Sequence, residues 1–240
     1  MEHLPVSTLQ LRRHAQSDLV DRVVEISKRE ESNQSSLQRT ALERYRTGSI
    51  FWNSMEEEYE EIEVLNAWLN LVDDLFFGQS LTAYCTIKLM SKKPRQNKNR
   101  VILGQCSVSS KRKFPSGNLH SIKCVIEIWT DPDIDNEHDQ RLSRLGILVH
   151  EMIHAYFRIY ACHWRPCYTL SYALESEGKT GHGFAWQDIA FAISIAAADP
   201  SYLGTHLQLG RIESLAKELN APKQDANVDL SRWGLSSEEI

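Results

Sequence analysis

DQRLSRLGILVHEMIHAYFRIYAC, residues 139–162, is the stretch that decides how this chain is interpreted. It holds His150, Glu151 and His154 in the pattern H-E-x-x-H. A step of four residues places both imidazoles on one side of a helical turn, close enough to hold one metal ion. Glu151 is offset by about 100°, so it flanks the metal and can take a proton from bound water. With nine His in 240 residues, an unrelated chain would contain this motif by chance with a probability of roughly a few per cent. The context must therefore support the motif.

The surrounding residues predict one long amphipathic helix over 139–162. Its apolar positions form a broad stripe: Leu142, Leu145, Val149, Met152, Ile153, Tyr156 and Tyr160. The two histidines fall on another face, as a metal site on a packed helix requires. Residues 131–139 are rich in Asp and Asn and supply N-cap candidates, while Pro166 predicts a stop near Trp164. The alternative is an ordinary amphipathic helix with two surface histidines.

A catalytic zinc ion usually has three protein ligands and one water, so a third ligand is needed. The sequence favours His182 in GHGFAW, residues 181–186, because flanking glycines let the backbone approach a metal closely. A helix is expected at 183–197, directly after this histidine. Three alternatives remain open for the third ligand: His163, Glu175 and Glu177. The metzincin spacing is absent, since Phe157 and Tyr160 stand where that pattern has Gly and His.

HEMIHAYF at 150–157 and GHGFAW at 181–186 resemble the SprT-like, or Spartan-type, zinc metalloproteases. The resemblance extends over about 110 residues, from Leu81 to about Ala197, and the two motifs are its specific part. It implies a zincin-like metalloprotease core and zinc-dependent hydrolysis of peptide bonds in proteins. Members of the family act on DNA-associated or DNA-crosslinked proteins. The resemblance also implies these roles: zinc ligands His150, His154 and His182, and catalytic acid/base Glu151.

The chain departs from the family pattern between the two motifs and after them. The segment between His154 and His182 is longer than in the better-known members, and it contains Cys162 and Cys167. No Cys follows Cys167, so we expect no four-cysteine zinc ribbon, and no tail with ubiquitin-binding or clamp-binding motifs. The chemistry therefore carries over more directly than a role in DNA repair.

Composition favours one folded domain with polar ends. With 240 residues, 42% of them hydrophobic, the chain can bury one good core. We expect a polar N-terminal arm at 1–50, flexible or partly helical, the metalloprotease domain at 51–219, and a polar C-terminal tail at 220–240 anchored by Trp233. No apolar run has the length of a signal peptide or a membrane span, and five irregularly spaced Cys argue against a secreted disulfide framework. The expected location is intracellular, nuclear or cytoplasmic.

Hydrophobic periodicity predicts the remaining elements. A capping box at 54–57 opens a helix that Gly78 ends. Period-two alternation predicts strands at 81–90, 101–107 and 121–129, with Cys85 and Cys124 on the buried face, and a further helix at 206–219. The fold class is therefore α+β, a small antiparallel sheet packed on helices that include the H-E-x-x-H helix.

The strand at 121–129 is a candidate to bind an extended substrate by strand addition at a partly exposed edge. Peptide hydrolysis also needs a donor for the developing oxyanion. Three residues near the motif are candidates for this donor: Arg158, Tyr168 and Tyr172.

Positive charge is segregated, since residues 75–126 contain no Asp or Glu in a chain whose net charge is −5. Two turn-like stretches, 91–100 and 111–118, are predicted to project from neighbouring strand ends and to bind nucleic-acid phosphates. The candidate residues are Lys92, Lys93, Arg95, Lys98, Arg100, Lys111, Arg112 and Lys113. Solvated basic loops are the alternative. Two other functions also stay open: a non-catalytic module that zinc only staples and that binds nucleic acid or protein, and a zinc hydrolase with a non-protein substrate.

Overall fold

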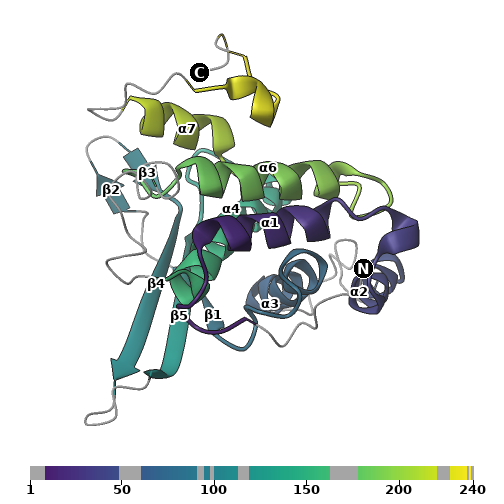
Figure 1. The fold of residues 1–240 in the computed structure, drawn as a ribbon. Helices are drawn as coiled ribbons and strands as arrows, with labels where there is room; N and C mark the ends of the chain where they lie inside the picture. Colours follow the sequence, from purple (N-terminus) through teal and green to yellow (C-terminus); the bar gives the residue numbers. More distant parts are fainter. Residues whose placement is uncertain are drawn as a thin grey trace.

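The computed structural model describes residues 9–48, 61–90, 95–97, 100–112, 119–162, 178–220, 228–236 and 238. Within them the fold is mixed α+β, with six α-helices, a three-stranded sheet and a two-stranded hairpin (Figure 1). The helices are α1 Gln16–Ser27, α2 Ser36–Arg46, α3 Glu61–Val72, α4 Glu137–Tyr160, α6 Phe184–Ala198 and α7 Arg211–Leu219. The strands are β1 Cys85–Met90, β2 Arg95–Asn97, β3 Arg100–Ile102, β4 Gly104–Arg112 and β5 Leu119–Trp129.

The three-stranded sheet is mixed and not antiparallel throughout, which corrects the predicted topology. Its order is β1-β5-β4, with β5 antiparallel to β4 and parallel to β1. Alternation of apolar residues reports which face of a strand is buried, and it carries no information on strand direction. Cys85 and Cys124 are paired neighbours on the buried face, as their positions in the alternation predict.

The central position of β5 overturns the prediction that residues 121–129 bind substrate through an open edge. From Cys124 to Ile128, β5 is paired with β1 on one side and with β4 on the other, so this part has no free edge to offer. In the described part of the chain β1 and β4 are the outer strands of this sheet, and β4 has β5 as its one strand neighbour. The sheet packs on α4, and α3 lies against β1.

The helix with the metal motif spans Glu137–Tyr160, close to its predicted range. Asn136 caps it, since its side-chain oxygen accepts hydrogen bonds from the backbone N–H of His138 and Asp139 at 2.8 and 3.3 Å. It ends before the predicted stop near Trp164. The reason is tertiary, because backbone N–H groups at 12–14 donate to the carbonyls of Ile159 and Tyr160.

Residues 16–46 are largely helical, in line with the prediction of a partly helical N-terminal segment, but they belong to the core and do not form a separate polar arm. α1 lies beside α6 (Figure 1), and both N-terminal helices bury apolar side chains: Leu19, Val20, Val23, Ile26, Ala41 and Leu42. Each helix has its own short apolar stripe, and a turn changes the phase between them. A single stripe across all fifty residues therefore does not exist, although each half is amphipathic.

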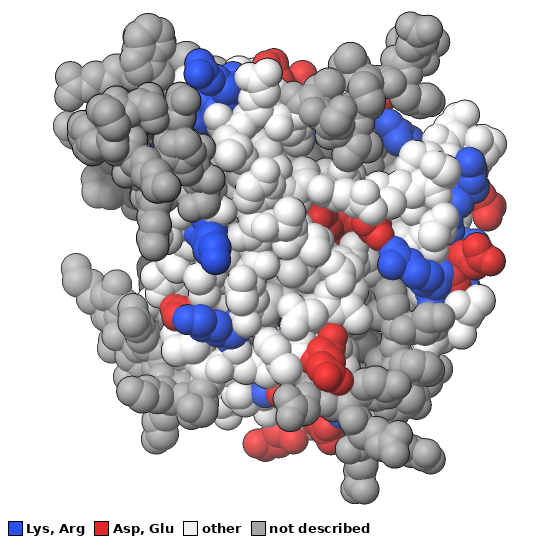
Figure 2. Space-filling view, turned by 90° about the horizontal axis from the view of Figure 1, so that it is seen from below, with Lys and Arg blue, Asp and Glu red and all other residues white. Residues whose placement is uncertain are grey.

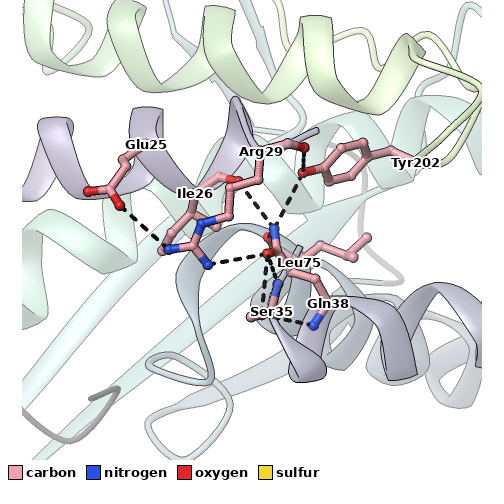
Figure 3. Close-up of polar contacts among 7 residues, drawn as sticks. All are labelled: Glu25, Ile26, Arg29, Ser35, Gln38, Leu75 and Tyr202. Atoms are coloured by element: carbon pink, nitrogen blue, oxygen red, sulfur yellow. Dashed lines mark hydrogen bonds and ion pairs between the residues drawn. The ribbon is translucent and has the colours of Figure 1, made fainter. Parts of the chain in front are cut away.

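A buried amide joins these helices to the rest of the core (Figure 3). Gln38 caps α2 together with Ser35, and its Nε2 donates to the carbonyls of Ile26 at 3.1 Å and Leu75 at 3.0 Å. Tyr202 follows α6 in the chain, and its hydroxyl donates to the carbonyl of Arg29 at 2.7 Å. The Gln38 amide and the Tyr202 hydroxyl are thus paired at the junction of α1, α2 and the segment after α3.

Two predictions about the ends of segments concern Gly78 as a helix stop and Trp233 as an anchor. Gly78 ends the helical segment after α3 with a left-handed conformation, φ 62°, as predicted. Trp233 is 1% exposed, and its Nε1 donates to Asp188 at 2.9 Å, so it anchors the C-terminal segment as expected. The capping box at 54–57 lies outside the described residues. No helix in the described part of the chain is both long and apolar enough to cross a membrane.

Candidate metal centre

The fold brings the three predicted histidines together. His150 and His154 come from consecutive turns of α4, and His182 lies just before α6. Their Nε2 atoms form a triangle, with 2.9 Å between His150 and His182, 3.1 Å between His154 and His182, and 3.3 Å between His150 and His154. Tetrahedral ligands at about 2.0–2.1 Å from zinc lie about 3.3 Å from one another. The three nitrogens therefore fit a single ion of that size.

Hydrogen bonds and an aromatic floor orient the rings. His150 Nδ1 lies 2.9 Å from the carbonyl of Leu209, so it carries the hydrogen and leaves the Nε2 lone pair for a ligand. The indole of Trp186 packs against all three imidazoles, with ring centroids 4.6, 6.0 and 5.0 Å from those of His150, His154 and His182. Trp186 follows His182 by one helical turn, so the GHGFAW motif supplies both a ring and its support.

Burial keeps these imidazoles neutral. It lowers the pKa of His150 to about 4 and of His182 to about 3, and it lowers the pKa of His154 well below the ordinary value. Repulsion among the three rings adds to the lowering for His154 and His182. A cluster of neutral imidazoles with converging lone pairs is the state that a transition-metal ion requires.

Glu151 stands apart from the three ligand candidates, as its offset on the helix predicts. The group that could hold a metal within the described residues is His150, His154 and His182. Glu151 points toward β4, where its carboxylate accepts the backbone N–H of Cys106. Burial raises its pKa to about 7, against the opposing influences of the Arg158 charge and the Cys106 N–H. A carboxyl group that titrates near neutral pH is suited to both accept and release a proton.

An open cleft of about 1290 Å³ leads to these side chains. One wall is β4 with the residues just before it, 102–108, and the other is the segment 207–214 with Lys217 of α7. Gly146 of α4 lets the second wall come close, because a Cβ there would overlap the carbonyl of Gln208. The volume is sufficient for several side chains of an extended peptide.

Arg158 is the one oxyanion-donor candidate that the structure describes, and it lines the cleft. Its guanidinium donates to the carbonyl of Cys106 and stays partly exposed to the cleft. The other candidates fall outside the described residues: Tyr168 and Tyr172 for the oxyanion, His163, Glu175 and Glu177 for the metal, and Cys167. Cys162 is a half-exposed free thiol.

The two basic stretches lie at opposite ends of the sheet, which corrects their predicted proximity. Met90, just before the first stretch, pairs with Trp129, while Arg112 in the second pairs with Leu119. Ten residue steps along β5 separate these pairs, about 33 Å. β1 and β4 run in opposite directions, so the chain leaves these two strands at opposite ends of the sheet. Figure 1 shows the β2–β3 hairpin far from the β4–β5 tip.

Four of the eight candidate basic residues have a described backbone position. Arg95 is on β2 and Arg100 on β3, while Lys111 and Arg112 end β4. The remaining candidates lie outside the described residues: Lys92, Lys93, Lys98 and Lys113. Figure 2 shows one face of the molecule, on which Lys and Arg form separate small groups with Asp and Glu among them.

Comparison of the chain with protein-family models, with curated proteins and with solved structures gives no match. The chemistry of the site therefore rests on its own residues. Three residues near the histidines escaped the sequence analysis: Thr180, Leu209 and Glu218. They act through hydrogen bonds to segments remote in sequence, and no periodic pattern signals such contacts.

Proposed function

We propose that this chain is a zinc-dependent metalloendopeptidase of the SprT-like type, built on a zincin-like core. The observation that carries the proposal is the set of three neutral imidazoles whose Nε2 atoms converge in an open cleft, with a buried carboxyl group beside them. Zinc would be held by His150, His154 and His182. When bound, it supplies a Lewis acid that polarises a peptide carbonyl and lowers the pKa of water to about 7.

The chain's own residues move the proton. Glu151 accepts the proton that the attacking water loses, and it later delivers this proton to the amine that leaves. Its pKa of about 7 favours both transfers near neutral pH. The N–H of Cys106 fixes the carboxyl group in place, so β4 positions the proton carrier. Arg158 contributes a positive charge to the cleft, where negative charge develops on the carbonyl oxygen.

The position of β4 favours an extended peptide as substrate. β4 is an outer strand whose residues 104–108 line the cleft, so a peptide segment can lie along it and pair with its backbone. Flexible or unfolded segments of proteins fit this geometry better than folded surfaces, since the substrate must adopt an extended form.

The decisive experiment compares Glu151→Gln with the parent chain. We expect loss of cleavage of an unfolded protein substrate, with about one zinc ion still bound per chain, because Glu151 lies outside the ligand group. Glu43→Gln, at an exposed carboxylate of α2 outside the cleft, is the matched control and should cleave normally. Loss of zinc together with activity would show that Glu151 is a ligand. A parent chain that binds zinc without any turnover favours the zinc-stapled binding module.

Nucleic-acid binding is a second candidate, favoured by the absence of Asp and Glu from residues 75–126. We expect weak, salt-dependent binding through phosphate contacts, which would direct cleavage to DNA-associated proteins. Two variants test the two basic stretches separately: Lys92→Ser/Lys93→Ser/Arg95→Ser in the first, and Lys111→Ser/Arg112→Ser/Lys113→Ser in the second. Fluorescence anisotropy with single- and double-stranded oligonucleotides at low salt measures each. Unchanged binding by both variants would exclude this segment as the nucleic-acid site.

A further inference from the structure

A buried carboxylate on α7 holds the loop that carries His182. Glu218 is 0% exposed, and its two oxygens accept hydrogen bonds from the backbone N–H of Lys179 at 2.5 Å and of Thr180 at 2.8 Å. Gly178 has φ +68°, and a Cβ at this position would overlap the carboxylate. The loop thus closes tightly around Glu218, two residues before the histidine, and needs a glycine to do so.

The directions of the hydrogen bonds around Thr180 determine which nitrogen of the His182 imidazole carries the hydrogen. The Thr180 hydroxyl donates its single hydrogen to Glu218 Oε2 at 2.6 Å. Its oxygen can then only accept from His182 Nδ1, which lies 3.1 Å away. The backbone carbonyl of Thr180 also accepts from this imidazole and raises its pKa, against the stronger effect of burial. Nδ1 therefore carries the hydrogen, and the Nε2 lone pair faces His150 and His154.

We infer that Glu218 and Thr180 are positioning residues for the third ligand, and that they set the affinity of the centre for zinc. The inference rests on the proposed metal centre and adds α7 to it. A carboxylate behind a ligating imidazole fixes the tautomer and increases the basicity of the metal-binding nitrogen. Here the effect passes through the threonine hydroxyl, and the same carboxylate fixes the backbone of the loop. Loss of such a partner typically weakens metal binding by about 10- to 100-fold.

Zinc affinity, measured by competition with a chromophoric chelator, tests this without any need for turnover. Thr180→Val removes the hydroxyl, and we expect zinc to bind about 10-fold more weakly. Thr180→Ser keeps the hydroxyl and should bind zinc as the parent does. Glu218→Gln replaces one acceptor oxygen by an NH2 group that faces donors, and its zinc affinity should fall by about 10-fold or more. Glu43→Gln makes the same chemical change at an exposed position of α2, outside the cleft, and should leave the affinity unchanged.

Melting temperatures with and without zinc separate positioning from mere support of the fold. A purely structural role of Glu218 would lower both melting temperatures equally and keep the zinc-induced increase. The inference requires this increase to shrink in Glu218→Gln and in Thr180→Val and to return in Thr180→Ser. Parental zinc affinity in both Thr180→Val and Glu218→Gln overturns it. A chain that shows the expected affinities without peptide cleavage contradicts the protease proposal alone, whereas a parent chain that binds no zinc overturns both.

Discussion

Gly104→Ala is the sharpest single test of how Glu151 is positioned. Gly104 begins β4 opposite α4, and a Cβ built on it would lie 2.7 Å from Oε1 and 3.0 Å from Cγ of Glu151. It would also lie 2.6 Å from Cγ2 of Ile147. These distances are shorter than any real Cβ contact tolerates, so Glu151, Ile147 or the start of β4 has to move.

The size of the effect follows from the displacement. Ordinary contact between such atoms begins at about 3.5 Å, so the carboxyl group must move by about 0.8 Å relative to β4. A misplacement of about 1 Å at a reacting group costs on the order of 100-fold in rate, equivalent to about 2.7 kcal/mol of barrier. Overpacking should also lower the free energy of unfolding by about 1–3 kcal/mol. The nearest atoms belong to Ile147 and Glu151 and to none of the three histidines, so zinc binding should persist.

The assay measures kcat/KM for a flexible peptide at saturating zinc, with zinc content and melting temperature from the same preparation. Ser109→Ala, on the same strand with an exposed side chain outside the cleft, is the control and should keep the parental kcat/KM. We expect Gly104→Ala to lose about 100-fold in kcat/KM with one zinc bound. Parental turnover in a folded, zinc-loaded Gly104→Ala chain would refute the assignment of Glu151 as a proton carrier held against β4.

Two further predictions concern the other cleft wall and the N-terminal helices. Gly146→Ala places a Cβ against the carbonyl of Gln208, which should push the second wall away from His150 and weaken zinc binding by about 10-fold, measured by chelator competition. Parental affinity would mean that this wall does not orient the ligand. Gln38→Met leaves two buried backbone carbonyls without their amide donor, so the free energy of unfolding should fall by about 2–4 kcal/mol in denaturant titrations, with zinc affinity unchanged. A loss below about 0.5 kcal/mol would show that water replaces the amide.

Four of the six described helices, α3, α4, α6 and α7, could be predicted from the sequence because their signals are local. The apolar stripe of α4 and the Asn136 cap lie within the helix and its first turn, so the helix was found within two residues at its start. Its end could not be predicted, because residues 12–14 supply the capping N–H groups from the far end of the chain. α1 and α2 were missed as core elements, since their two stripes have different phases and cancel over a long window.

The sheet shows where periodicity stops being informative. All three strands of the sheet were expected from alternation, yet alternation is the same for a central strand and an outer strand, and for parallel and antiparallel pairs. The order β1-β5-β4 therefore came from the structure alone. This order places residues 121–129 in the central strand and leaves β4 as an outer strand that lines the cleft.

Local sequence patterns predict some residues of the candidate site, and only the fold reveals the others. The helical spacing predicts His150, Glu151 and His154. The flanking glycines favour His182 as the third ligand, although the sequence left three alternatives open. Glu218 lies 38 residues beyond Thr180, and nothing between them is periodic. Its carboxylate looks in the sequence like any acidic residue of an amphipathic helix, and only the fold shows that it is buried behind a histidine.

The two walls of the cleft position different parts of the chemistry, and this makes the proposed roles separable. β4 contacts Glu151 through the N–H of Cys106 and the space at Gly104. The segment from 207 to α7 orients these two imidazoles, through the carbonyl of Leu209 and through Glu218 with the loop it holds. Changes in β4 should therefore lower turnover at constant zinc affinity, and changes in the second wall should lower zinc affinity first. A hydrolytic centre requires both walls, whereas a zinc-stapled binding module requires only the second. A loss of turnover after changes beside Glu151 in β4, at constant zinc affinity, thus favours the hydrolytic centre over the zinc-stapled module. This test does not require the natural substrate.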